Sequence, residues 1–264
     1  MKISKIVLVV LFVTISLGAY SQYRIKSINR IRYYNEQPDN FIEEFQYGAD
    51  NRVSVIRKAK VGAADELVNV QYDAKKRTIQ AVADQGTILY SIKQDKEGNI
   101  VEYSGSMSGD KLTEIEYETG NIVSFSITSS GNKNDLKVKY ESGKIATVTG
   151  SKSSPIIFTY DNGVLKTIKR GESERFDLTW DDGKIVKIEK QRFGKLISVQ
   201  EMKYDEEGKI ITETLQDDKG KLLFDNKIEY EKGEGNDGVF YKFYNWNLNI
   251  LMNQKTFMIA PYWL

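Results

Sequence analysis

The chain has 264 residues, with 38 Lys and Arg against 37 Asp and Glu, and it contains no His and no Cys. Without these two residue types, a Ser-His-Asp triad, a thiolate nucleophile, a disulfide framework and a zinc site with nitrogen or sulfur ligands are excluded. The formal net charge of +1 also argues against a nucleic-acid partner, which would require a surplus of basic residues.

Residues 1–21 have the three parts of a secretory signal peptide. Two lysines supply the positive end, an apolar stretch runs from Ile6 to Ile15, and small residues precede the expected cleavage site after Ser21. The apolar stretch is short for a membrane-spanning helix, which needs about 20 residues. We therefore expect an exported protein, located in the periplasm or at the cell exterior, with an uncleaved anchor as the alternative.

One short motif recurs between residues 22 and 236. It consists of an apolar residue, a spacer, an aromatic residue, an acidic residue, and a Gly that is followed by Ile or Val. From Tyr47 to Tyr230, the eight steps between copies have a mean length of about 23 residues. Gln94 replaces the aromatic residue in one copy, and the others have Tyr47, Tyr72, Tyr117, Tyr140, Tyr160, Trp180, Tyr204 and Tyr230.

Each copy has the sequence pattern of a β-hairpin. Alternation up to the turn, as in Leu136, Val138 and Tyr140, predicts a strand with one buried face. Asp-Asn-Gly at 161–163 supplies the positive φ that a tight hairpin turn needs, whereas outgoing strands such as 184–188 alternate less clearly. Two strands per copy predict an all-β antiparallel meander of about 16–18 strands, forming a curled single-layer sheet or an open or closed barrel.

Residues 237–264 have a different composition from the repeats. Lys242 and Lys255 are the charged residues between Gly238 and Leu264, and aromatic residues are frequent. We expect this segment to close the same domain by packing into the apolar concavity of the sheet and capping an open edge. An aromatic binding platform or a surface for a partner is the alternative.

Cross-strand packing that fixes the register is the simplest explanation of the aromatic column. If the rings contact a ligand instead, they would suit a hydrophobic molecule such as a lipid, or they would stack on the sugar rings of a glycan. The candidate ligand-binding residues are Tyr140, Tyr160, Trp180, Tyr204, Trp246 and Trp263.

Catalysis by paired carboxylates, as in a glycosidase, remains open to a chain without His or Cys. Among the acids outside the strict repeat, the candidates are Glu43, Glu44, Asp65, Glu66, Glu172 and Glu174, and we expect them to be solvated surface groups. We expect no cofactor and no metal. The chain has no Gly-rich phosphate loop, and the segment Asp95–Asn99 lacks the spacing of a calcium loop and is interpreted as a turn.

The Tyr-Asp-x-x-Gly-x-Ile copies resemble the YD repeats of secreted RHS-type proteins, whose strands wind into hollow β shells. Residues 45–264 also resemble a family of secreted Gram-negative proteins of unknown function that have a porin-like fold. The shared features are the signal peptide, the run of hairpins and an Asn- and Leu-rich close at 244–251. This resemblance implies a many-stranded curled sheet in a Gram-negative envelope, and it implies no reaction.

These observations favour an exported, non-enzymatic protein that binds a hydrophobic molecule, a glycan or an envelope partner on a curved sheet. The alternatives are an outer-membrane β-barrel or envelope assembly component, and a carboxylate-dependent glycosidase. Charged residues make up 28% of the chain and the apolar runs are short, so we expect that the strands do not span a membrane.

Overall fold

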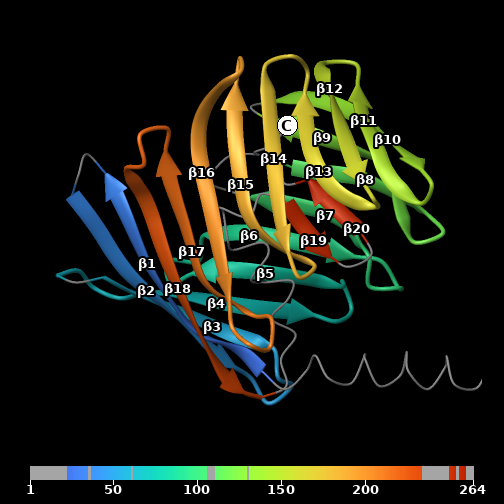
Figure 1. Ribbon diagram of the computed structural model, residues 1–264. Coiled ribbons are helices and arrows are strands. Elements are labelled where there is room, and N and C mark those ends of the chain that lie inside the picture. Colours follow the sequence, from blue (N-terminus) through green and yellow to red (C-terminus); the bar gives the residue numbers. More distant parts are fainter. Residues whose placement is uncertain are drawn as a thin grey trace, which may run out of the picture.

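The computed structural model describes residues 23–34, 37–60, 62–105, 111–129, 131–233, 250–253 and 256–259. All regular elements in these ranges are β-strands (Figure 1). The signal peptide predicted over residues 1–21 and most of the segment 237–264 lie outside the described residues. No helix that could cross a membrane occurs in the described part of the chain.

Eighteen strands form one sheet, and two further strands form a separate hairpin. The strands of the sheet are β1 (Tyr23–Tyr34), β2 (Gln37–Tyr47), β3 (Val53–Lys60), β4 (Glu66–Asp73), β5 (Thr78–Ala83), β6 (Ile88–Gln94), β7 (Ile100–Gly105), β8 (Lys111–Glu118), β9 (Asn121–Ser129), β10 (Asn132–Glu141), β11 (Lys144–Gly150), β12 (Ser153–Asp161), β13 (Val164–Arg170), β14 (Glu174–Asp181), β15 (Lys184–Arg192), β16 (Lys195–Tyr204), β17 (Ile210–Asp217) and β18 (Leu222–Lys232). The separate hairpin consists of β19 (Ile250–Asn253) and β20 (Thr256–Ile259).

The sheet is an antiparallel meander that closes on itself. Each strand pairs with the next along the chain, and β1 also pairs with β18. The predicted all-β meander is therefore confirmed, and of the predicted forms the sheet adopts the closed barrel. Because β1 and β18 occupy each other's edges, the 18-stranded sheet has no open edge. The closing role predicted for residues 237–264 stays a prediction.

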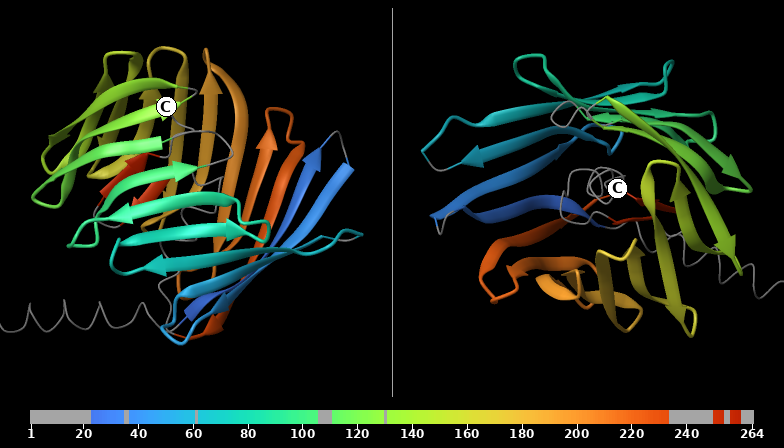
Figure 2. Two further views of the ribbon diagram at one scale, coloured as in Figure 1. Left: turned by 180° about the vertical axis from the view of Figure 1, so that it is seen from behind. Right: turned by 90° about the horizontal axis from the view of Figure 1, so that it is seen from above.

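The barrel forms a ring of strands when it is seen from above (Figure 2). Strands β14–β18 form one side and β4–β8 the other, and the hairpin β19–β20 lies between them in the front, back and top views (Figures 1 and 2). Seen from above, the hairpin falls inside the outline of the ring (Figure 2).

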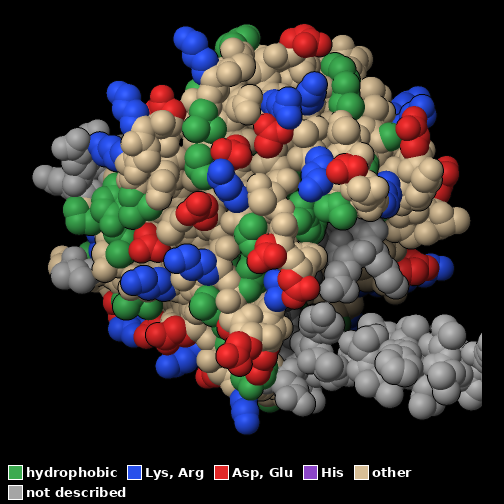
Figure 3. Space-filling view, in the orientation of Figure 1, with side chains coloured by type: hydrophobic (Ala, Val, Ile, Leu, Met, Phe, Trp, Pro, Cys, Tyr) green, Lys and Arg blue, Asp and Glu red, His purple; other side chains and the backbone are tan. Residues whose placement is uncertain are grey.

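Alternation along the strands gives the ring two chemically different faces. In β14, Phe176 and Leu178 are buried, whereas Arg175 and Thr179 are exposed. The buried side chains form two apolar clusters on the inner face, one from β8 to β16 and the other from β1 to β6 with β18. Lys, Arg, Asp and Glu side chains are spread over the outer face in view in Figure 3.

Two local features explain the hairpin units. Five turns have two residues at positive φ, as Asn162 (48°) and Gly163 (80°) do, which is the type I′ geometry that matches the twist of paired strands. Beyond the turn, the register skips one residue of the outgoing strand: Lys139 pairs with Thr147 and Tyr140 with Ile145, so Ala146 is bulged. This extra residue explains why the outgoing strands alternate less clearly in sequence.

Candidate functional site

The candidate site is the inner wall of the ring, together with the aromatic column near one of its ends. Each column residue stands one or two positions before a hairpin turn, and all these turns lie at the same end of the barrel because the strands alternate in direction. Tyr140 lies two residues from Val138 and four from the buried Leu136, so its ring belongs to the inner face.

Seven aromatic residues donate a hydrogen bond to a backbone carbonyl of the neighbouring unit, at 2.6–3.1 Å. The donors and acceptors are Tyr47 to Ile25, Tyr72 to Val53, Tyr117 to Ile100, Tyr140 to Ile122, Trp180 to Leu165, Tyr204 to Ile185 and Tyr230 to Ile210. Each acceptor stands opposite the column residue of the preceding unit and beside the bulged residue, where the ladder is interrupted. The column therefore joins consecutive units and supplies a hydrogen-bond donor to seven of these carbonyls.

Burial changes the acidity of these phenols. It raises the pKa of Tyr72, Tyr117 and Tyr204 to about 12. The pKa values of Tyr140 and Tyr160 are raised for the same reason. The hydroxyl groups therefore keep their protons at neutral pH and act as hydrogen-bond donors.

The structure brings four of the six predicted ligand-binding residues into one column. Tyr140, Tyr160, Trp180 and Tyr204 are half-buried at equivalent positions of β10, β12, β14 and β16. The other two, Trp246 and Trp263, lie outside the described residues. Ligand binding by these six residues stays a prediction.

The ninth unit of the ring is assembled from the two ends of the described sheet. Tyr230 of β18 pairs with Ile25 of β1, Glu229 pairs with Ser27, and Lys26 is skipped. This register is the one found within an ordinary unit such as β10–β11, except that no turn joins the strands. Tyr47 then donates to the carbonyl of Ile25, so the column continues across the junction.

Buried polar side chains on the inner face gather around this junction. We call this region the seam: β18 and β1, with β2 next to β1, and β17 and then β16 next to β18. Arg30 Nε donates to Glu43 Oε2 at 2.5 Å, and both side chains are 3% exposed. Burial raises the pKa of Glu43, and the charge and hydrogen bond of Arg30 offset part of that rise.

Glu213 is the buried polar group on the other side of the seam. It accepts hydrogen bonds from Gln200 Nε2 at 2.6 Å and from Asn226 Nδ2 at 2.9 Å. Asn226 also pairs across the seam with Arg30, so the two groups are adjacent in the ring. Sequence analysis missed these residues, although a polar residue at an inward-facing strand position is the signal that could have identified them.

The acids proposed for glycosidase chemistry do not form one centre. Glu43 and Glu44 are consecutive in β2 and point to opposite faces. On the outer face, Arg57 forms ion pairs with both Glu44 and Asp65, each at 2.7 Å. Glu66 of β4 lies 3.6 Å from Lys58.

The other two predicted acids lie in a different part of the ring. Glu172 is in the turn between β13 and β14, and Glu174 begins β14. Three cationic groups surround Glu174: Arg192 at 2.8 Å, Lys190 at 3.4 Å and Arg170 at 3.6 Å. Burial favours a higher pKa for Glu174, but the hydrogen bonds and charges of Arg192 and Lys190 hold it below its usual range. It therefore stays ionised and could not serve as a general acid.

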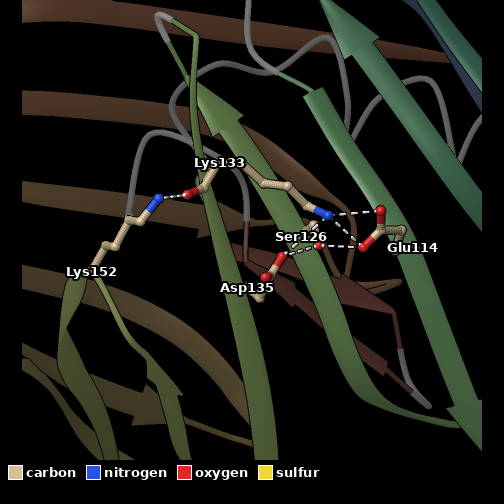
Figure 4. Close-up of polar contacts among 5 residues, drawn as sticks. All are labelled: Glu114, Ser126, Lys133, Asp135 and Lys152. Atoms are coloured by element: carbon tan, nitrogen blue, oxygen red, sulfur yellow. Dashed lines mark hydrogen bonds and ion pairs between the residues drawn. The ribbon is translucent and has the colours of Figure 1, made fainter.

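A polar cluster that sequence analysis did not single out lies on the outer face of β8–β10 (Figure 4). Lys133 Nζ donates to both carboxylate oxygens of Glu114 at 2.7 and 2.8 Å, and Ser126 Oγ lies 2.6 Å from Asp135 and 2.9 Å from Glu114. Hydrogen bonds from Lys133 and Ser126 lower the pKa of Glu114, and a hydrogen bond from Ser126 lowers that of Asp135. Because both carboxyls stay ionised, this cluster also lacks the proton donor of a glycosidase.

The segment Asp95–Asn99 is a turn, as predicted. Asp95 Oδ1 accepts hydrogen bonds from the backbone N–H groups of Glu97 and Asn99, each at 2.9 Å. The carboxylate is therefore used to hold the turn. Within the described ranges, no group of three Asp or Glu side chains is placed to hold a metal ion.

Comparison with known proteins finds no matching family model and no matching curated protein. Among solved structures, a porin-like protein from Bacteroides uniformis is similar over 79% of this chain and 97% of its own length, with 8% identity and a TM-score of 0.44. A chain of the TcdB2-TccC3-Cdc42 structure is similar over 73% of this chain and 15% of its own length, with 10% identity and a TM-score of 0.28. At such low identity, neither similarity transfers an activity to this chain.

Proposed function

We propose that this protein is an exported, non-enzymatic binding protein that holds a hydrophobic molecule or segment against the inner wall of its barrel. The observation that carries the proposal is the polarity of the closed ring, whose buried apolar side chains line the inside while charged side chains cover the outside. An apolar wall enclosed by hydrogen-bonded strands is the usual environment for a hydrophobic ligand.

The charged residues on the outer face favour a barrel that is surrounded by water and not by lipid. Lys137 and Lys139 lie on the outer face of β10, and Glu201 lies on that of β16, all three exposed. A membrane barrel needs an apolar outer band, and Lys at the bilayer midplane costs about 2–4 kcal/mol. Export rests on the signal peptide predicted at residues 1–21, and envelope fractionation of the native host tests it.

The inner wall is a better candidate than a glycan platform on the column. Stacking on a sugar needs an accessible aromatic face and free polar groups beside it. In this protein the rings are half-buried, and the hydroxyl or indole N–H groups of seven of them donate hydrogen bonds to backbone carbonyls. The column therefore lines one end of the wall, and we assign to it the role of a border of the binding surface.

Matched substitutions on the two faces test this function. Residues 22–264 are purified without detergent, and binding of a fluorescent long-chain fatty acid is measured by titration. We expect the inward substitution Val138→Asn to weaken binding about tenfold, because it places an amide in an apolar wall at a cost of about 1–3 kcal/mol. The outward substitution Val164→Asn is the control and should leave binding unchanged.

Three results would contradict the proposal. They are absence of binding both to the full chain and to a variant whose inner wall has been exposed, equal effects of the two substitutions, and a need for detergent to keep the protein in solution. The last result would favour the outer-membrane barrel. If Val138→Asn does not fold, Val138→Thr, which keeps the shape of the side chain and adds one hydroxyl, replaces it.

A further inference from the structure

The inner wall is more completely buried than a ring of this size would achieve by its own side chains. About eight strands make a barrel that side chains can fill, whereas barrels of about 16–18 strands leave an open channel. In this ring of 18 strands, Ile56 and Ile92 are 0% exposed and Val148 is 1% exposed. Further atoms must therefore cover the wall.

The hairpin β19–β20 is in the right place to provide these atoms. The front and back views show it between the two sides of the ring, and the top view shows it within the outline of the ring (Figures 1 and 2). A hairpin of two four-residue strands is marginally stable at best in water without further packing. Its formation therefore requires a surface to pack on.

The sequence of the hairpin fits burial on both faces. In the ring, apolar and polar residues alternate, which suits one buried face. In β19, the consecutive residues Ile250, Leu251 and Met252 are all apolar, and β20 has the run Phe257, Met258 and Ile259. Because successive side chains point to opposite faces, such runs are typical of strands that are enclosed on both sides.

From these observations we propose that the hairpin β19–β20 is the resident occupant of the inner wall. The inference rests on the proposed function, because it names an apolar segment of the same chain as the partner of that binding surface. An added hydrophobic molecule would then compete with the hairpin for the wall.

Cysteine accessibility in the full chain tests this inference directly, because the natural sequence has no Cys to interfere. Leu251→Cys and Met252→Cys place single thiols on the two opposite faces of the hairpin. Phe193→Cys, at a position 76% exposed in a turn, and Val148→Cys, on the inner wall, are the exposed and buried controls. Reaction with a water-soluble thiol reagent is followed under native conditions.

We expect both hairpin thiols to react about 100-fold more slowly than the thiol of Phe193→Cys, because labelling then requires an opening of the ring. A hairpin lying on an outer surface would protect one face and leave the other reactive, and that result would overturn the inference. If Leu251→Cys does not fold, Met258→Cys reports the same face, since Leu251 and Met258 are cross-strand partners.

A second measurement separates this inference from the proposed function. The double substitution Met252→Asp and Phe257→Asp places two like charges on a cross-strand pair and should expel the hairpin from the wall. We expect fatty-acid binding to become about tenfold tighter. Protected hairpin thiols in the full chain, with no fatty-acid binding even after the double substitution, would refute the proposed binding of a hydrophobic molecule alone, whereas reactive thiols with intact binding would refute the inference alone.

Discussion

The unit β10–β11 and the seam unit β18–β1 have the same register but are held together in different ways. In β10–β11, Ser142 and Gly143 form a turn between Glu141 and Lys144. The seam unit has no turn. Its strands pair along their length, and Arg24 and Glu231, which are 207 residues apart, form an ion pair across them at 2.7 Å. A turn fixes the register covalently, so a junction without one must fix it through side chains.

The buried polar groups gather at the seam unit, which is the unit without a turn. Strands with one apolar face can slip by two residues without changing which face is buried, because the side-chain period is two. At the seam, a slip of two residues would bring Arg30 opposite Phe224 or Ile228 in place of Asn226. The cost of burying a charge against these apolar residues is large, so we expect the polar group to select the observed register.

The largest expected effect comes from Arg30→Met. This substitution leaves the buried carboxylate of Glu43 without its cation and should lower the free energy of unfolding by about 3–5 kcal/mol, as measured by urea denaturation. The double variant Arg30→Met and Glu43→Leu should recover most of the loss, because no unpaired charge remains. A loss below about 1 kcal/mol in Arg30→Met would show that the ion pair between Arg30 and Glu43 does not stabilise the seam.

In the ordinary unit, the turn is the vulnerable feature. Gly143 has φ of +75°, and an added Cβ would meet no atom within 4 Å, so Gly143→Ala tests backbone strain alone. We expect a loss of about 1–2 kcal/mol in the free energy of unfolding. Gly143→Asn is the control, since Asn tolerates this conformation, and equal losses in the two variants would argue against strain as the cause.

The aromatic column should contribute equally to both kinds of unit. Tyr140→Phe and Tyr230→Phe each remove one hydroxyl donor from a backbone carbonyl and keep the ring. Each should lower the free energy of unfolding by about 1 kcal/mol. If Tyr230→Phe alone has an effect, the column stabilises the seam specifically, and the equivalence of the units is wrong.

The smallest expected effect is the pH dependence of the seam. Burial raises the pKa of Glu43 above that of the unfolded chain, so the folded state binds this proton more tightly. Ionisation of Glu43 should therefore lower the free energy of unfolding at neutral pH. This loss should decrease as the pH falls through the raised pKa of Glu43 and the carboxyl takes up a proton. We expect urea denaturation between pH 7 and pH 5 to show the free energies of unfolding of the native protein and of Glu43→Gln converging, because protonated Glu43 resembles Gln. Divergence would contradict a raised pKa for Glu43.

Much of the ring could be predicted from the sequence because its units are local. The Asn162–Gly163 turn, the alternation before it and the repeat length each depend on residues close together in the chain, and the predicted antiparallel meander is confirmed. The column residues Tyr140, Tyr160, Trp180 and Tyr204 could be placed at equivalent corners for the same reason. Their hydrogen bonds to the neighbouring unit were not predicted, since the acceptor is a backbone carbonyl that any residue type provides.

The sequence of each copy is sufficient for a hairpin, its turn and its buried face, because short-range backbone preferences and side-chain alternation specify all three. That residues 23–34 complete the last copy depends on pairing across some 200 residues, and no local pattern reveals it. Closure of the ring, the polar seam and the position of β19–β20 likewise result from long-range packing, where the free energy depends on which distant strands meet.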